Sequence, residues 1–413
     1  LTDATARPWA LYLNLLYGSG WLSISLMSVA MLLALRLPRL ETWLGGLDLA
    51  YQAHRRIAEW GVGLGLLHYL LKLGSKAARR QGWLVKPDDF PSQLLAWSAP
   101  YRDSAKSGGE WALYMVLALV AVALLRRIPY RWFARLHRLL PAAYLILVYH
   151  ALVFMPQAMW NGATAALGSA LMLAGSVAAL ISLLGLVGRR RRVRREASYL
   201  RELGLNVLEL RGRLRAGWPG HESGQFALVT FDPREGAHPF TIASAWQDDG
   251  ETRFAIKALG DYTSRLPRLL SVGDPIWIEG PYGRFVFNDD KPRQVWVAGG
   301  IGLTPFVARM QELAATGRSI RPVDLFYSTR VGDAEILRRI KALAEAAGVR
   351  LHAILSNRDG PLHAQQLMAA VPDWLNGSVW FCGPTAFGLA LREGLTAEGL
   401  ADDDFHQEVF EFR

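Results

Sequence analysis

Long apolar stretches dominate the first 187 residues of the chain, and shorter apolar runs follow them. The long stretches cover residues 9–36, 49–73, 111–125, 137–156 and 163–187. A helix needs about 20 apolar residues to cross the hydrocarbon core of a bilayer. Gly18 and Gly20 interrupt the first stretch, so we expect an interfacial piece followed by a span. The pattern predicts an α-helical transmembrane bundle of 5–6 helices over residues 1–190.

The second half of the chain has the pattern of a soluble protein. Residues 205–290 carry short apolar runs separated by Gly, Pro and Asp, which predicts a small antiparallel β-barrel over residues 196–290. From residue 291 the pattern changes to strand, glycine loop and helix. Strands are expected at 295–298, 323–327, 350–355 and 378–382, with helices at 306–315 and 333–347. These alternating elements predict an α/β nucleotide-binding domain over residues 291–413.

The distribution of charged residues predicts the orientation of the helical half in the membrane. The net charge is +10, but basic residues cluster at the ends of apolar segments, which argues against nucleic acid as a partner. The run RRRRVRR at 189–195 follows the last span. We therefore expect the protein to lie in the cell inner membrane, with its soluble half in the cytoplasm. The loop 74–110 then lies outside, although it holds Lys76, Arg79, Arg80 and Lys86.

The cysteine content of the chain excludes two kinds of structural site. Cys382 is the single cysteine, so there is neither an internal disulfide framework nor a cysteine-rich metal site. No secretory signal with a small-residue cleavage site follows Leu1.

Four histidines in the apolar half carry the first chemical hypothesis. His54 and His68 are fourteen residues apart, and His137 and His150 are thirteen apart. At 1.5 Å per residue these spacings span about 21 and about 20 Å of helix. Two such helices can hold two stacked b-type haems, with His54 opposite His137 and His68 opposite His150. Any one of these histidines could instead be a hydrogen-bonded packing residue, but matched pairs inside a membrane indicate function.

The two histidine segments differ in helical phase. At about 100° per residue, Gly61 and Gly65 return to the face of His54 and His68, where glycine would let a flat macrocycle approach. His150 lies off the face of His137, and Pro141 is expected to kink that helix and correct the phase.

A segment in the predicted barrel identifies a family. His238-Pro-Phe-Thr-Ile-Ala-Ser244 resembles the flavin motif of the NADPH oxidase and ferric reductase superfamily. The resemblance extends over almost the whole chain and includes both histidine spacings. The chain is most similar to bacterial members, because it has neither an EF-hand loop nor a long insert. The resemblance implies that FAD, NADPH and two b-type haems are the cofactors.

The resemblance also assigns flavin contacts. His238, Pro239, Phe240 and Thr241 would line the flavin and its ribityl chain, with Ser244 close by. The turn Gly260-Asp-Tyr262-Thr263 matches a family turn whose N–H groups would meet the FAD pyrophosphate, which suits the affinity of exposed amides for anions. Lys257 is a weaker candidate for a contact to FAD.

Three further segments of the soluble half are candidates for binding the nicotinamide nucleotide, and the first is the glycine loop that follows the strand at 295–298. The loop contains Gly299, Gly300 and Gly302 and leads into Thr304 and Pro305, where a pyrophosphate can approach a helix N-terminus.

In relatives, residues at the positions of Ser328 and Arg330 bind the 2′-phosphate, so NADPH is favoured over NADH. Cys382, Gly383 and Pro384 match the segment near the nicotinamide, with Cys382 as a contact rather than a nucleophile. Phe412 matches the aromatic residue that stacks on the isoalloxazine and moves aside for the nicotinamide.

The function expected from these residues is a relay of electrons from cytosolic NADPH through FAD and the haems to an acceptor across the membrane. Molecular oxygen, giving superoxide, is the favoured acceptor. Oxygen-reducing members have an Arg on an early span and a second His one turn after the outer ligand, whereas this chain has Arg36 only at the inner end and Lys72. A ferric chelate, a quinone or a protein partner are the alternatives. The expected partners are the lipid bilayer, NADPH and the acceptor, and no obligate protein partner is evident.

Overall fold

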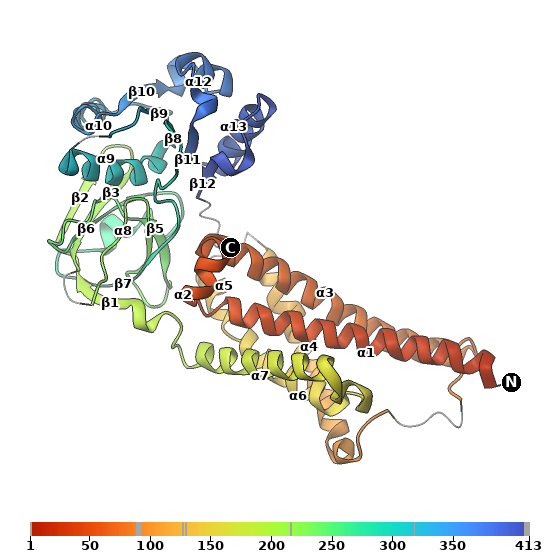
Figure 1. Cartoon of the computed structure of the whole chain (residues 1–413). Coiled ribbons are helices and arrows are strands. Elements are labelled where there is room, and N and C mark those ends of the chain that lie inside the picture. Colours follow the sequence, from red (N-terminus) through yellow and green to blue (C-terminus); the bar gives the residue numbers. More distant parts are fainter. Residues whose placement is uncertain are drawn as a thin grey trace. The chain divides into compact units, whose positions relative to one another are not determined.

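A computed structural model describes residues 2–87, 93–125, 128, 130–214, 217–317 and 319–408 (Figure 1). The chain divides after Arg189 into two compact units.

The first unit is helical. Its helices are α1 (Thr2–Leu33), α2 (Pro38–Leu44), α3 (Leu47–Arg80), α4 (Arg102–Leu124), α5 (Tyr130–His137), α6 (Leu140–Phe154) and α7 (Gly162–Leu183), with short 3-10 turns η1 (Ala96–Tyr101) and η2 (Gln157–Trp160). Within the described ranges, four segments are long and apolar enough to cross a membrane: Arg7–Leu33, Ala96–Leu124, Arg131–Phe154 and Gly162–Leu183. Helix α3 is as long but more polar, because Arg55, Glu59 and Lys72 lie within it.

Two sequence predictions about this unit are wrong in detail. Gly18 and Gly20 lie inside the single helix α1, so the first apolar stretch is not split. The predicted outer loop at 74–110 is shorter, since α3 continues to Arg80 and α4 already begins at Arg102. Charged residues flanking an apolar core are compatible with helix, so hydropathy alone placed both helix ends too close to the apolar segments.

The polarity of the helical unit is inverted relative to a soluble bundle. Small hydroxyl residues of α1 are buried, and Ser28 Oγ lies 2.7 Å from Tyr144 Oη on α6. Large apolar side chains face outward instead: Trp60 is 72% exposed, Trp111 73% and Leu173 69%. Interior hydroxyls and an apolar exterior are typical of helices packed in lipid.

A break replaces the kink that Pro141 predicts. Helix α5 ends at His137 and α6 begins at Leu140. Proline near the start of a helix is tolerated because the first N–H groups have no intrahelical partner. The two histidines of this segment therefore lie on separate helices and need not share one helical phase.

The second unit begins with an antiparallel barrel. Its elements are β1 (Arg192–Glu196), β2 (Tyr199–Leu203), β3 (Val207–Arg213), β4 (Phe226–Thr230), β5 (His238–Thr241), β6 (Glu251–Lys257), the short α8 (Leu266–Leu269) and β7 (Pro275–Tyr282). The strands form two sheets, in the orders β1-β7-β4-β5 and β2-β3-β6, which a bridge between Ile242 and Phe254 connects. Alternate residues such as Leu210, Phe254 and Ile278 fill the core.

A five-stranded parallel sheet follows, in the order β10-β9-β8-β11-β12. Its elements are β8 (Gln294–Gly299), α9 (Thr304–Thr316), β9 (Val323–Thr329), α10 (Ala334–Ala347), β10 (Arg350–Leu355), α12 (Ala364–Ala370), β11 (Ser378–Cys382), α13 (Thr385–Ala397) and β12 (Phe405–Gln407). The predicted α/β sheet is confirmed. Trp296 and Ala298 pack in the core under α9 and α10, whereas Val295 and Val297 pack in the core on the opposite face. The order reverses between β8 and β11, where open sheets bind nucleotides.

Candidate functional site

The first unit brings the four histidines together as two pairs. The ring centroids of His54 and His137 are 6.2 Å apart, and those of His68 and His150 are also 6.2 Å apart. In both pairs α3 supplies one ring, while α5 or α6 supplies the other. The pairing is the one that the spacing predicts.

Three of the four rings contact a backbone carbonyl through Nδ1. His54 Nδ1 lies 2.9 Å from the Ala30 oxygen, and His68 Nδ1 lies 2.8 Å from the Leu16 oxygen, both on α1. His150 Nδ1 lies 2.8 Å from the Ala105 oxygen on α4. A carbonyl oxygen can only accept, so each Nδ1 carries the proton. The Nε2 of each ring then keeps its lone pair for a metal.

His137 differs from the other three. Its Nδ1 is buried and has no hydrogen-bond partner among the residues that the structure describes. Phe133, one turn earlier on α5, packs against the ring at 5.0 Å, as Phe154 packs against His150 at 4.9 Å.

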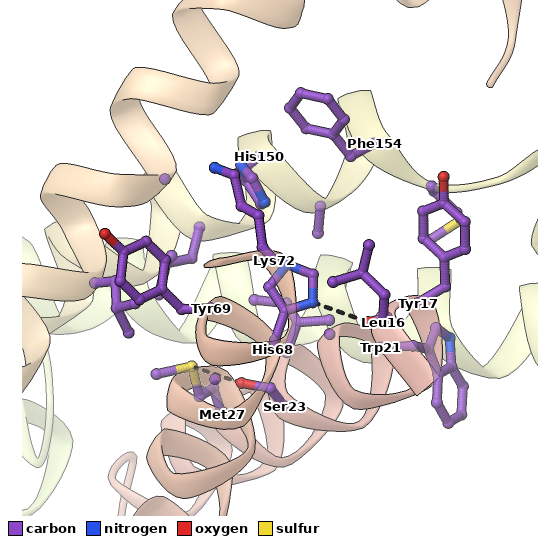
Figure 2. A pocket seen from close by; sticks show the side chains of 18 of the residues that line it. Leu16, Tyr17, Trp21, Ser23, Met27, His68, Tyr69, Lys72, His150 and Phe154 are labelled. Atoms are coloured by element: carbon purple, nitrogen blue, oxygen red, sulfur yellow. Dashed lines mark hydrogen bonds between the residues drawn. The ribbon is translucent and has the colours of Figure 1, made fainter. Parts of the chain in front are cut away.

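A pocket of about 280 Å³ surrounds the His68–His150 pair, and both rings enter it (Figure 2). Most of its lining is apolar and comes from α1, α3, α4 and α6, including Trp21, Met27 and Phe154. Lys72, one turn after His68, also lines it, and its ammonium lies 2.5 Å from Glu110 Oε1 on α4. Lys106 lines the pocket as well, so its apolar interior is bordered by two lysines and one glutamate.

The two glycines expected on the histidine face of α3 have different surroundings. A Cβ on Gly61 would lie 3.2 Å from Met27 Cγ, so Gly61 faces α1, where Ser23 Oγ donates to its carbonyl at 2.7 Å. The prediction for Gly61 is wrong, because the close crossing of α1 and α3 uses this position. Gly65 does line the pocket.

The histidine arrangement fits a metal held between paired imidazoles. A metal bound by two opposed imidazole nitrogens at about 2 Å requires ring centres about 6 Å apart. Both pairs meet that separation, and three Nδ1–H donors already point away from the metal position. The donor set of two neutral imidazoles is that of a low-spin haem, so the residues present fit a haem at each pair.

In the second unit, β5 consists of His238, Pro239, Phe240 and Thr241. The His238 ring stacks on Tyr262 with 5.0 Å between centroids, which joins the first predicted flavin segment to the second. Burial lowers the pKa of His238 and raises that of Tyr262 to about 12, so both rings are neutral near pH 7. They form an uncharged aromatic surface beside β5.

The second flavin segment is an exposed turn between β6 and α8. Thr263 Oγ1 accepts hydrogen bonds from the Leu259 and Gly260 N–H groups, at 3.1 and 3.0 Å. The amides that the resemblance directs at a pyrophosphate are thus bound by the turn's own threonine. An anion at this turn would have to replace that hydroxyl or share the donors.

His221 supports the end of the flavin segment, and the sequence pattern did not predict this role. The ring is buried between Trp218 and Trp246, and its Nε2 donates to the Ser244 carbonyl at 2.9 Å, at the end of the flavin segment. Trp218 Nε1 donates to His221 Nδ1 at 3.4 Å, and burial lowers the pKa of His221. A lone histidine in a loop carries no periodic signal, so only tertiary packing identifies it.

The glycine loop and the Cys382–Pro384 segment lie against each other at the point where the strand order reverses. A Cβ on Gly302 would lie 2.1 Å from the Cys382 oxygen, and a Cβ on Gly299 would lie 2.7 Å from Pro384 Cδ. These two glycines permit the close approach of two loops. Gly383 faces Gly299 in the same contact.

Gly300 is the glycine of this loop that takes no part in that contact. It adopts φ +57°, and a Cβ there would lie 3.7 Å from Lys257 Nζ of the barrel. A cation beside the start of α9 favours an anion at that place. Thr304 and Pro305, which open α9, are buried.

The other predicted nucleotide residues follow the same sheet edge. Ser328 pairs in register with Gly299, near the carboxyl end of β9, and Arg330 follows β9. Cys382 ends β11, is buried, and has its thiol pKa raised well above the usual value by burial. The thiol is therefore protonated near pH 7. Phe412 lies outside the described residues.

Comparisons with known proteins agree with this architecture. Residues 19–148 match the family "Ferric reductase like transmembrane component", and residues 193–286 match a FAD-binding domain family. The electron transfer component of toluate 1,2-dioxygenase from Pseudomonas putida is 30% identical over 197 residues, which are 45% of this chain and 58% of that protein. An NADPH oxidoreductase from Mycobacterium tuberculosis is 25% identical over 211 residues, or 48% and 55% of the two chains. The chain thus spans a little over half the length of these relatives.

Among solved structures, a flavohemoglobin from Malassezia yamatoensis aligns over 99% of both chains, with a TM-score of 0.50 and 16% identity, and this likeness concerns the fold alone. An apolar helical unit followed by a FAD-binding barrel and a nucleotide-binding sheet defines a membrane flavoprotein oxidoreductase. The chain belongs to the NADPH oxidase and ferric reductase superfamily.

Proposed function

We propose that the protein transfers electrons from NADPH through FAD and two b-type haems to an acceptor on the opposite side of the membrane, with oxygen as the acceptor and superoxide as the product. The observation that carries this proposal is the pair of imidazole sites with equal 6.2 Å separation in a chain that also has a FAD-binding barrel. FAD would convert a hydride into single electrons, and bis-histidine haems would carry them one at a time.

The soluble unit binds and orients the donor. The Gly300 loop, the start of α9 and Lys257 would receive the pyrophosphate of NADPH, and Ser328 and Arg330 its 2′-phosphate. Cys382, Gly383 and Pro384 would support the nicotinamide. The stacked His238 and Tyr262 rings and the rest of β5 would hold the flavin.

The helical unit holds the carriers in two levels. His54 and His137 form the level nearer the cytoplasm, and His68 and His150 form the outer one. The basic run at 189–195 supports this orientation, in the inner membrane, with the soluble unit in the cytoplasm. Phe412 is proposed to cover the isoalloxazine until the nicotinamide displaces it.

The outer pocket supports a small, uncharged acceptor. Its lining is mainly apolar, and the Lys72 charge is balanced by Glu110, while Lys106 adds one positive charge that would stabilise a superoxide anion as it forms. An apolar pocket admits oxygen more readily than a hydrated ferric chelate. Ferric-chelate reduction is the second candidate, because the family matched by residues 19–148 is named for it.

The acceptor can be tested with the purified full chain and NADPH. Superoxide would be followed as cytochrome c reduction that superoxide dismutase suppresses, beside reduction of ferric citrate and of a short-chain quinone. The proposal expects the dismutase-sensitive rate to exceed the other two. A dominant ferric or quinone rate without superoxide would reassign the acceptor.

A further inference from the structure

Each backbone carbonyl that contacts a ring of the two histidine pairs is followed, four residues later in its chain, by a small residue. The acceptors for His54, His68 and His150 are the carbonyls of Ala30, Leu16 and Ala105. Four residues after these acceptors the sequence has Ala34, Gly20 and Gly109. A helical side chain covers the surface over the turn that precedes it, so a side chain at this position would cover the accepting carbonyl. Small residues therefore leave these carbonyls open to a ring.

The room at two of these positions is very small. A Cβ on Gly109 would lie 2.3 Å from His150 Nδ1, and a Cβ on Gly20 would lie 3.0 Å from His68 Nδ1. Each ring thus rests directly on the backbone of the next helix. Nearby glycines lack this contact: a Cβ on Gly108 would meet only Ile146, at 3.3 Å, and a Cβ on Gly18 would meet nothing within 4 Å.

We propose that Gly20 and Gly109 are positioning residues for the His68–His150 pair. They admit the edge of each imidazole to a helix carbonyl, which holds the proton on Nδ1 and directs Nε2 at the metal position. A hydrogen bond from the distal nitrogen also makes an imidazole a stronger donor to its metal, which favours the oxidised metal. The inference rests on the proposed function, in that the metal is a haem.

The test compares Gly20→Ala and Gly109→Ala with Gly18→Ala and Gly108→Ala in the purified full chain. Haem per FAD, the low-spin ferric EPR signal and both midpoint potentials would be measured. Alanine is the better helix former, so helix propensity does not oppose any of the four changes. Gly20→Ala is expected to keep its haem but shift the ferrous/ferric ratio at one site at least tenfold toward ferrous, about 59 mV for one electron.

Gly109→Ala, with the closer contact, is expected to lose one of two haems per FAD, while the two control variants match the wild type. The inference is overturned if Gly20→Ala and Gly109→Ala match the wild type in haem content, EPR signal and potentials, or if the controls change equally. If the Gly109→Ala protein does not accumulate in cells, the haem content, EPR signal and potentials of Gly20→Ala decide the test. A wild-type protein without haem would overturn the proposed function as well, so the two failures are distinguishable.

Discussion

His68 connects the pocket, the α1 carbonyl and the opposite ring of His150, so its replacement tests the pairing. In His68→Leu an apolar side chain of similar size removes the donor nitrogen, and we expect haem to fall from two to one per FAD. Pyridine haemochrome content against flavin absorbance measures this ratio. Trp60→Leu on the same helix is the control, because Trp60 is 72% exposed. Unchanged haem in His68→Leu would exclude the residue as a ligand.

Arg330 follows β9 at the edge of the sheet that carries the glycine loop. A charge-assisted hydrogen bond contributes about 1.5–3 kcal/mol, so Arg330→Ala is expected to raise the KM for NADPH about 10- to 100-fold. The KM for NADH should change less than about twofold, because NADH lacks the 2′-phosphate. Arg338→Ala is the control, since Arg338 is exposed and pairs with Glu335 on α10. Equal losses for both nucleotides would refute the role.

At the scale of elements, the segment after β5 depends on a neutral histidine. Burial lowers the pKa of His221 below the value of about 6.5 that it has in the unfolded chain. The stability it contributes is therefore present above pH 6.5 and is lost as the pH falls through the lowered pKa. His238 acts in the same direction, because burial lowers its pKa too. We expect FAD to be released on acidification from pH 7 to 5, measured by flavin fluorescence.

Two variants separate titration from hydrogen bonding at this position. His221→Gln keeps a donor for the Ser244 carbonyl but does not titrate, so its acid dependence should be shallower than that of the wild type. His221→Phe also does not titrate, yet it leaves the carbonyl without this donor and should cost about 1–3 kcal/mol at every pH. Acid profiles identical to the wild type in both variants would show that His221 does not control flavin retention.

The elements also show what could be predicted from sequence. Strand β9, predicted at 323–327, and β11, predicted at 378–382, are found at Val323–Thr329 and Ser378–Cys382, because buried strands have a local apolar signature. The histidine pairs were predictable because helical rise is fixed. The contacts of Gly20, Gly61 and His221 were not, since each depends on a helix or loop distant in sequence. Their side chains, or lack of them, respond to a neighbour that periodicity does not identify.

The whole molecule joins a nucleotide-binding unit to a helical unit with two imidazole pairs. The proposed relay needs both units, one to take electrons from NADPH and the other to carry them across the membrane. The account therefore requires both haem sites to receive electrons from NADPH by way of FAD in the intact chain. This requirement holds whichever acceptor is used.

The most direct test is anaerobic titration of the purified full chain with NADPH while the haem and flavin absorbance are recorded. Excluding oxygen removes the acceptor and makes the result independent of its identity. The account predicts two haems per FAD, both of which become fully reduced. A chain that holds no haem, or haems that stay oxidised while FAD is reduced, would contradict it.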